Sequence, residues 1–368
     1  MDELLRTVIW ILGAVFAGTV AVFAFWRVRS IIRVWRAPKR PLHSVQAMIW
    51  RDPGDVSRLD LGAGPGGSDG RPMPPFSFLE EHFTGSQPCV SVRDARGRVW
   101  RIKWGDEVNA EALATRLAWA AGYFVEITYY VAEGRVEGAS GLHRAAACLD
   151  DDCRFRDARF ELDEQGVVKH FDEHSWAWND NPFVGTRELN GLKIVMMWLS
   201  NWDAKDVRDV ARGSNTAIFE YPLRSGFREA RYLIIDWGGA FGRWGSTVVG
   251  RRRWDCHAFA IESDAFVSGV DEEFIRFGYT GQRTSDIADG IRISDAQWLL
   301  DRLDRLSEAQ IADAVRASGG TADDAETFSR ALRVRLDRLG EAAKKPPNLQ
   351  AKWADNAGAE SPASPALQ

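Results

Sequence analysis

The chain has 368 residues, of which 45% are hydrophobic and 27% are charged, and its formal net charge is -5 at pH 7. This length allows one large domain or two ordinary ones around a real apolar core, so an enzyme is possible. The acidic balance argues against a general nucleic-acid-binding protein, and we expect no nucleic-acid partner. The 4 cysteines are too few for a disulfide scaffold and are predicted to be reduced thiols.

An uncharged segment near the N-terminus predicts a membrane anchor. Residues 7–26 carry no charge, and this run has about the length that an α-helix needs to cross a bilayer. A cleaved signal peptide is the alternative, but its first residues should be basic, whereas Asp2 and Glu3 precede this run. The basic residues up to residue 40 then predict, by the positive-inside rule, an anchor in the inner (plasma) membrane with the following chain in the cytoplasm.

Two further segments are rich in Gly, Pro, Ser and Asp or in other small and polar residues. Residues 41–75 include "DPGDVSRLDLGAGPGGSDGRPMPP" and are predicted to be a linker. Residues 344–368 are predicted to be a disordered tail. The globular body is therefore expected from about Phe76 to Leu339.

The body begins with a predicted β-hairpin. Residues 88–105 alternate apolar and polar side chains on both sides of "DARG", a turn sequence, and Lys103 falls near the end of the second strand.

A helix and a further strand are expected next. Apolar residues recur at helical spacing in "DEVNAEALATRLAWAAGY", and Gly122 suits a position just after a helix end. Glu107 and Glu111 share one face of this helix. The aromatic and β-branched residues at 123–131 predict a strand.

The middle of the chain gives a weaker pattern. "RFRDARFELDEQGVVKHF" could form a short hairpin with "DEQG" as its turn.

A helix buried along one side is then predicted from the spacing of Leu189, Leu192, Met196 and Leu199. Its C-terminal end delivers polar residues to one place. These residues are Asn201, Asp203, Lys205 and Asp206.

Two strands and several helices complete the body. Residues 214–222 and 229–236 are predicted strands, and Asp236 comes just before Gly238, where the backbone is free to turn. Beyond them the chain shows helical periodicity, with Ser294 and Ser307 as predicted N-caps.

The order of these parts is that required for phosphoryl transfer from ATP, in which a protein mainly positions groups and neutralises charge. A lysine held by a glutamate can contact phosphates, a carboxylate can orient the acceptor hydroxyl, and Asn and Asp oxygens can hold Mg²⁺. Taken singly, Lys103 with Glu111, or Asp203 with Lys205, could be a surface ion pair of little energetic value. Only their joint order and spacing favour a catalytic interpretation.

With these motifs the sequence resembles the protein-kinase-like superfamily, in particular its atypical HipA-like and CotH-like bacterial branch, and more distantly the phosphatidylinositol kinases. "FTGSQPCVSV" resembles the HipA-like phosphate loop at Gly85, Ser86 and Gln87, but Cys89 stands where that pattern has lysine. The resemblance implies an α+β, two-lobed fold behind the transmembrane helix, with a small β-rich N-lobe over residues 76–132 and a helical C-lobe over residues 133–343.

The resemblance also implies the site residues and the cofactors, ATP and Mg²⁺. Asp203 would be catalytic together with Lys205. The other residues are implied to bind ATP (Gly85, Ser86, Gln87, Lys103 and Glu111) or the metal (Asn215, Asp236 and Asp206).

One departure concerns the metal. Kinases place an asparagine five residues after the catalytic aspartate, and here that position is Arg208. The nearest downstream asparagine is Asn215, so we expect an inserted turn between them, with Asp206 or Asp209 as alternative oxygen donors.

The sequence therefore predicts a membrane-anchored phosphotransferase whose acceptor is a protein, a lipid headgroup or a small molecule. The alternatives are a pseudokinase, which binds nucleotide without turnover, and a membrane scaffold that binds none. The changed asparagine spacing and Cys89 favour the pseudokinase.

Overall fold

A computed structural model describes residues 45–85, 87–223, 226–244 and 254–344. The predicted membrane anchor at residues 7–26 and its basic flank lie outside these ranges. So do Ser86 and, apart from its first residue, the predicted tail. None of the helices within them combines the length and the hydropathy that a bilayer-spanning segment requires.

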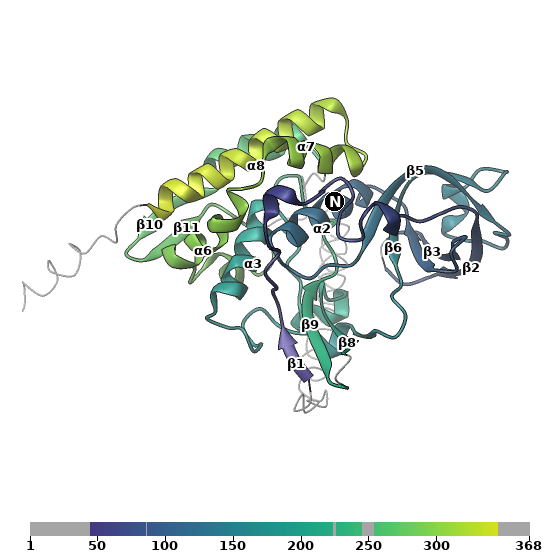
Figure 1. Cartoon of the computed structure of the whole chain (residues 1–368), viewed down its shortest axis with the longest axis horizontal. Coiled ribbons are helices and arrows are strands. Elements are labelled where there is room, and N and C mark those ends of the chain that lie inside the picture. Colours follow the sequence, from purple (N-terminus) through teal and green to yellow (C-terminus); the bar gives the residue numbers. More distant parts are fainter. Residues whose placement is uncertain (1–44, 86, 224–225, 245–253, 345–368) are drawn as a thin grey trace, which may run out of the picture.

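The N-terminal part of the body is a closed β-barrel with the strand order β2-β3-β4-β6-β5 (Figure 1). Its interior is aromatic and aliphatic, with Trp100, Ile102 and Phe160 fully buried. Because successive side chains of a strand point to opposite faces, Arg101 and Lys103 on β4 lie on the outer face. The strands are β2 (Phe76–His82), β3 (Cys89–Arg93), β4 (Val99–Lys103), β5 (Thr128–Glu137) and β6 (Arg154–Leu162).

The first predicted hairpin is confirmed and the second is wrong. β3 and β4 pair antiparallel, with Cys89 opposite Lys103. By contrast, β6 pairs with β4 and β5, whereas the next strand, β7 (Val168–His170), pairs with β8 (Thr216–Pro222) in another sheet. The turn at residues 163–166 therefore carries the chain from one sheet to the other.

Two boundaries in this region also differ from expectation. The strand predicted at residues 123–131 begins only at Thr128. It then continues beyond residue 132, the expected end of the β-rich lobe, and β6 also belongs to the barrel. The β-rich part therefore extends to Leu162.

A second sheet has the order β1-β9-β8-β7. β1 (Val45–Met48) lies in the predicted linker, yet it pairs parallel with β9 (Arg228–Ile234). Later in the same segment Val56 and Leu61 are buried against the body. The linker prediction is therefore wrong for residues 45–75, because apolar side chains between the glycines and prolines anchor the segment.

Helix α2 (Val108–Ala120) connects the two parts of the body, since it packs on β5 and β6 and also on α7 (Glu308–Ala317). It ends as predicted: Gly122 adopts φ +92, and a Cβ there would lie 2.5 Å from the carbonyl oxygen of Arg51. This close approach also requires glycine.

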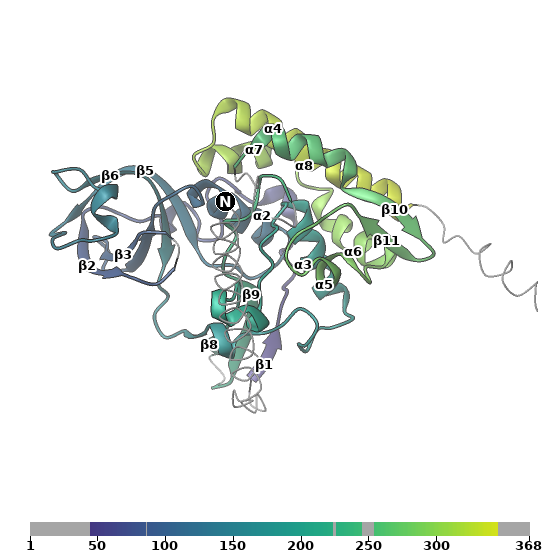
Figure 2. The ribbon, with the colours of Figure 1, turned by 180° about the vertical axis from the view of Figure 1, so that it is seen from behind.

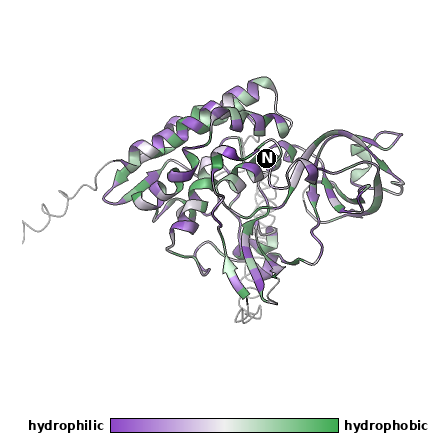
Figure 3. Cartoon of the chain, in the orientation of Figure 1, coloured by the Kyte–Doolittle hydropathy of each residue, from purple (hydrophilic) through white to green (hydrophobic). Residues whose placement is uncertain are grey.

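Apart from the second sheet, the C-terminal part is helical, with one small hairpin of β10 and β11 (Figure 2). α3 is buried on nearly all sides rather than on one, because α5, α6 and α8 pack around it. Figure 3 shows hydrophobic and hydrophilic residues mixed along α8, whose positions Phe328, Leu332, Leu336 and Leu339 are buried. The elements are α3 (Arg187–Trp198), α4 (Cys256–Ile261), β10 (Val267–Asp271), β11 (Phe274–Phe277), α5 (Thr284–Ala288), α6 (Ile293–Leu303), α7 (Glu308–Ala317) and α8 (Ala322–Ala343).

The fold is thus α+β, with a β-rich N-terminal part and a helical C-terminal part. α2 and α3 lie between the barrel and the outer helices in both views of the ribbon.

Candidate functional site

Lys103, at the end of β4, meets two glutamates from the start of α2. Its Nζ lies 2.7 Å from Glu111 Oε1 and 2.9 Å from Glu107 Oε2. Glu107 is the residue before the helix and Glu111 is one turn further on, so both carboxylates face the strand. The predicted pairing of Lys103 with Glu111 is present, and Glu107 is an additional partner.

Burial disfavours the charge on Lys103, but Glu111, Asp236 and Glu107 outweigh burial and raise the pKa of Lys103 above its ordinary value. Lys103 is therefore a cation at every physiological pH. Glu111 also binds Arg159 on β6, with Arg159 Nη1 2.5 Å from Glu111 Oε2. The glutamate thus has a cation on each of its two oxygens.

Asp236 follows β9 and joins the same group of charges. Its carboxylate oxygen lies within 4.8 Å of those of Glu107 and Glu111. Burial alone would raise the pKa of Asp236, but Lys103 and the Gly238 N–H, which donates to Asp236 Oδ1 at 2.9 Å, lower it below its ordinary value. Asp236 is therefore ionised despite its burial.

Asp203 lies just beyond α3 and is also buried. Its Oδ2 is 3.2 Å from Lys205 Nζ, and its Oδ1 accepts a hydrogen bond of 2.8 Å from Gln282 Nε2. Burial and the charge of Asp236 raise the pKa of Asp203, although Lys205 opposes them. A Cβ at Gly239, in the turn after Asp236, would lie 3.1 Å from Asp203 Cβ, so the two aspartates lie in one site.

Two asparagines fix the backbone that carries these aspartates. Asn215 Nδ2 donates to the Asp203 carbonyl oxygen at 2.7 Å, and Asn201 Nδ2 donates to that of Asp236 at 3.3 Å. A Cβ at Gly239 would lie 2.8 Å from Asn201 Oδ1, so the turn after Asp236 packs directly on this loop. Because Asn215 Nδ2 makes the hydrogen bond to Asp203, the amide oxygen is the atom of Asn215 that could bind a cation.

The spacing of Asn215 has a structural cause. A 3-10 helix, Val207–Arg212, lies between Asp203 and Asn215 and supplies the expected inserted turn. The Lys205 carbonyl oxygen accepts a hydrogen bond from the Asn215 N–H.

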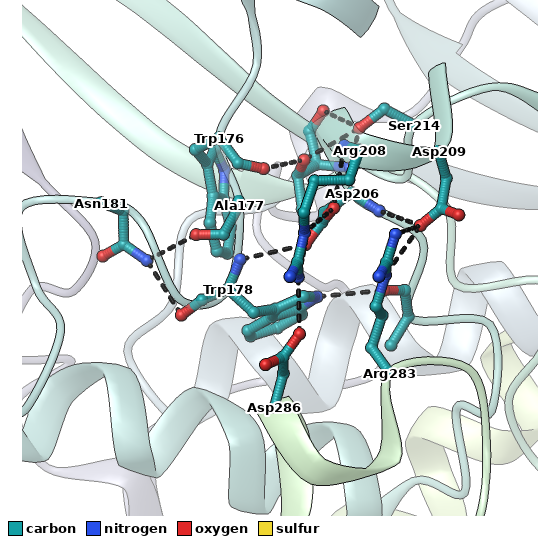
Figure 4. Close-up of polar contacts among 12 residues, drawn as sticks. Trp176, Ala177, Trp178, Asn181, Asp206, Arg208, Asp209, Ser214, Arg283 and Asp286 are labelled. Atoms are coloured by element: carbon teal, nitrogen blue, oxygen red, sulfur yellow. Dashed lines mark hydrogen bonds and ion pairs between the residues drawn. The ribbon is translucent and has the colours of Figure 1, made fainter. Parts of the chain in front are cut away.

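Asp206, predicted as a metal ligand, has a different environment (Figure 4). Its side chain is fully buried, Arg208 Nε donates to Oδ1 at 2.9 Å, and the Trp178 N–H donates to Oδ2 at 3.1 Å. It also caps the 3-10 helix that comes next in the chain. Both oxygens are thus engaged by the protein, and a metal ion would have to displace these contacts to bind Asp206.

The predicted phosphate loop connects β2 with β3. Gly85 adopts φ +88, and its carbonyl oxygen accepts a hydrogen bond from Arg144 Nη2 at 3.0 Å. Gln87 Nε2 donates to Asp106 Oδ1 at 3.1 Å, just before α2. The described part of this loop is therefore tied to the start of α2, where Glu107 binds Lys103.

Arg335 on α8 holds the start of the loop that carries Asp203. It is fully buried, and its guanidinium lies over the Phe259 ring at 3.6 Å. It donates to the Trp198 carbonyl oxygen at 3.0 Å and to Ser200 Oγ at 2.7 Å. These groups end α3, where helix carbonyls have no partner within the helix.

Sequence patterns missed Arg335, Gln282 and Arg159. Each is a common residue type outside any motif, and only tertiary contacts connect it with the site. Glu107 could have been assigned, because it lies one turn before Glu111 on the same predicted helix face.

Two solved structures are similar to this chain at low scores. The Golgi casein kinase has a TM-score of 0.32 and 10% sequence identity, covering 78% of this chain and 76% of that chain. The Rio2 kinase-ADP/Mg2+-phosphoaspartate complex from Chaetomium thermophilum has a TM-score of 0.29 and 12% identity, covering 71% and 72%. No protein-family model and no curated protein matches the sequence. Scores this low carry no argument about function, so the function is inferred from the site itself.

Proposed function

We propose that this chain is an ATP- and Mg²⁺-dependent phosphotransferase with a kinase-like fold, anchored in the plasma membrane through residues 7–26 with its catalytic part in the cytoplasm. The acceptor is a hydroxyl group of a protein, a lipid headgroup or a small molecule.

The observation that carries the proposal is the convergence of Lys103, Asp203 and Asp236 from three distant segments. The lysine comes from a strand of the barrel, and the two aspartates follow a helix and a strand of the other part. A carboxylate oxygen of Asp236 lies within 4.8 Å of that of Glu111, which binds Lys103. A Cβ at Gly239, in the turn after Asp236, would lie 3.1 Å from Asp203 Cβ. A surface ion pair would need none of this convergence.

The donor set suits a triphosphate with its magnesium. Asp236, held ionised, and the Asn215 amide oxygen would hold the ion, since Mg²⁺ prefers oxygen ligands. Bound there, the ion would neutralise charge on the phosphates. Lys103 would contact the phosphates, Lys205 would offset charge on the moving phosphoryl group, and Asp203 would accept the hydroxyl proton.

Nucleotide binding without turnover is the second candidate. Gln282 and Lys205 already engage the two oxygens of Asp203, and an acceptor hydroxyl would have to share one of them. Cys89, which lies opposite Lys103, also supplies no charge where the HipA-like pattern has a lysine.

A thermal-shift titration with ATP and Mg²⁺ tests both candidates. Saturation at about 100 times the Kd should stabilise the fold by about 2.7 kcal/mol. Lys103→Met should reduce this shift. If ATP with Mg²⁺ does not raise the melting temperature, both candidates are excluded in favour of a scaffold that binds no nucleotide.

Transfer of labelled γ-phosphate to the protein itself or to added lysate then separates enzyme from pseudokinase. Asp203→Asn should reduce transfer by roughly 10²–10⁴-fold while keeping the ATP-dependent thermal shift. The amide should not harm the fold, because it replaces a buried carboxylate whose pKa is raised. Equal transfer by the variant would refute the role of Asp203.

A further inference from the structure

A thiol, an imidazole and a carboxylate converge where the start of α4 meets the start of α8. Cys256 Sγ lies 3.8 Å from Asp323 Oδ2, and His257 Nε2 lies 3.3 Å from the same oxygen. The ligand atoms of all three residues lie within 4.8 Å of one another. None of these residues belongs to the charged group around Lys103 and Asp203.

The distance from His257 Nε2 to Asp323 Oδ2 equals that between adjacent ligands of one tetrahedral zinc ion, and the distance from Cys256 Sγ is a few tenths of an ångström longer. With Zn–N and Zn–O bonds of about 2.0 Å and a Zn–S bond of about 2.3 Å, adjacent ligands lie about 3.3 Å (N to O) and about 3.5 Å (S to O) apart. An ion could therefore enter with only small movements of the three side chains.

The carboxylate of Asp323 has no capping role in its own helix. The next residue, Asp324, forms the capping box of α8 with Thr321. Likewise Asp255, not Cys256 or His257, caps α4 by accepting a hydrogen bond from the Ala258 N–H at 2.9 Å. Within the described part of the chain, the Asp323 carboxylate makes its polar contacts with Cys256 and His257.

An aromatic cluster beneath these residues holds the two helix starts together. The Phe328 ring of α8 lies 4.9 Å from that of Trp254 and 5.4 Å from that of Phe259 on α4, measured between ring centroids. All three rings belong to the main core or pack against it. Core packing thus fixes the two helix starts that contain the ligands, as a preorganised metal site requires.

We propose that Cys256, His257 and Asp323 form a Zn²⁺ site. Thiolate and imidazole ligands favour zinc over magnesium or calcium, which require oxygen. Cys256 is buried, whereas the side chains of His257 and Asp323 are 74% and 66% exposed, so the fourth coordination position opens to water. As the S–Zn bond forms, the thiol releases its proton to solvent.

The proposed zinc site would connect two helices that are linked to the candidate active site. α4 is the first described helix after the turn at Asp236, and α8 also carries Arg335, which holds the loop before Asp203. Bound zinc would therefore fix the start of α4 to the start of α8, the helix whose Arg335 holds the loop before Asp203. The proposal does not depend on phosphotransfer.

Cobalt provides a spectroscopic test, because a thiolate bound to Co²⁺ gives an intense near-ultraviolet charge-transfer band that oxygen ligands do not give. The probe is Co²⁺ added to the full-length chain, reduced, freed of metal by a chelator and kept in detergent. We expect the band to saturate at one Co²⁺ per chain and to disappear on adding one equivalent of Zn²⁺, which binds more tightly. Co²⁺ at the magnesium site would add no such band.

Variants decide which residues bind. Cys256→Ser should abolish the band, whereas Cys153→Ser, the matched control, should keep it. His257→Ala and Asp323→Asn change exposed side chains, so their fold should persist, and each should weaken Co²⁺ binding at least about tenfold. No band in the wild type, a band in Cys256→Ser, or full affinity in both exposed variants would overturn the proposal.

Discussion

The two parts of the molecule hold their site residues by different means. On the barrel side, Lys103 is fixed by opposite charges, since Glu107, Glu111 and Asp236 surround it and Arg159 holds Glu111. On the helical side, side-chain amides and Arg335 bind backbone carbonyls around Asp203 and Asp236.

The difference has its cause in the local structure. A strand fixes its backbone through ladder hydrogen bonds, so its outward side chains need only charge compensation. The loops after α3 and β9 have no ladder, and their carbonyls need donors from elsewhere. Removing a charge should therefore destabilise the protein mainly on the barrel side. Removing a hydrogen-bond donor should destabilise it mainly on the helical side.

Glu111→Ala should have the largest effect. The change removes one carboxylate partner from Lys103 and one from buried Arg159. Breaking a buried ion pair in this way costs about 3–5 kcal/mol in the free energy of unfolding. Urea unfolding followed by circular dichroism measures this loss. Glu326→Ala is the matched control, because Glu326 pairs with Arg330 on the surface with both side chains more than 60% exposed, and it should cost less than about 1 kcal/mol. Equal losses in both variants would contradict the importance of burial here.

Arg335→Lys should have the next largest effect, on the helical side. Arg335 donates to the carbonyl oxygens of Trp198 and Phe259 and to the hydroxyls of Ser200 and Ser263. A lysine keeps the charge but cannot reach all four acceptors at once. The unsatisfied buried groups should cost about 2–3 kcal/mol in the free energy of unfolding. Arg338→Lys, one turn away and 46% exposed, should stay within about 0.5 kcal/mol of the wild type. A stable Arg335→Lys variant would show that charge alone is enough on this side.

Gln282→Glu should have the smallest effect, a shift in pH dependence. Asp203 must be ionised to accept a proton, so phosphoryl transfer should fall as the pH falls through its pKa, which burial and Asp236 raise above its ordinary value. A carboxylate in place of the Gln282 amide disfavours the ionised form and raises this pKa further. The acidic limb of the pH–rate profile should therefore move to higher pH.

Gln297→Glu is the control for this shift, because Gln297 Nε2 donates to the Ala343 carbonyl oxygen instead. Its acidic limb should stay where the wild type has it. An unmoved limb in Gln282→Glu would mean that Asp203 is not the group whose titration limits the rate.

Local patterns in the sequence predicted local structure well. The hairpin of β3 and β4, the end of α2 at Gly122 and the N-cap at Ser307 are all present. Ser294 was wrongly predicted as an N-cap: α6 begins at Ile293, and the Arg292 N–H is satisfied by Asp295 instead. Helix and strand signals depend on neighbours within a few residues, so they can be read directly from the chain.

The sequence alone therefore determined the β3–β4 hairpin, the helices α2 and α3, the candidate residues of the site and the pairing of Lys103 with Glu111. Only the tertiary structure decided that residues 45–48 add a strand to β9, that Asp206 is engaged by Arg208, and that Gln282 contacts Asp203. The reason is physical: these contacts join segments whose proximity depends on how the sheets and helices pack, and no local periodicity records that packing.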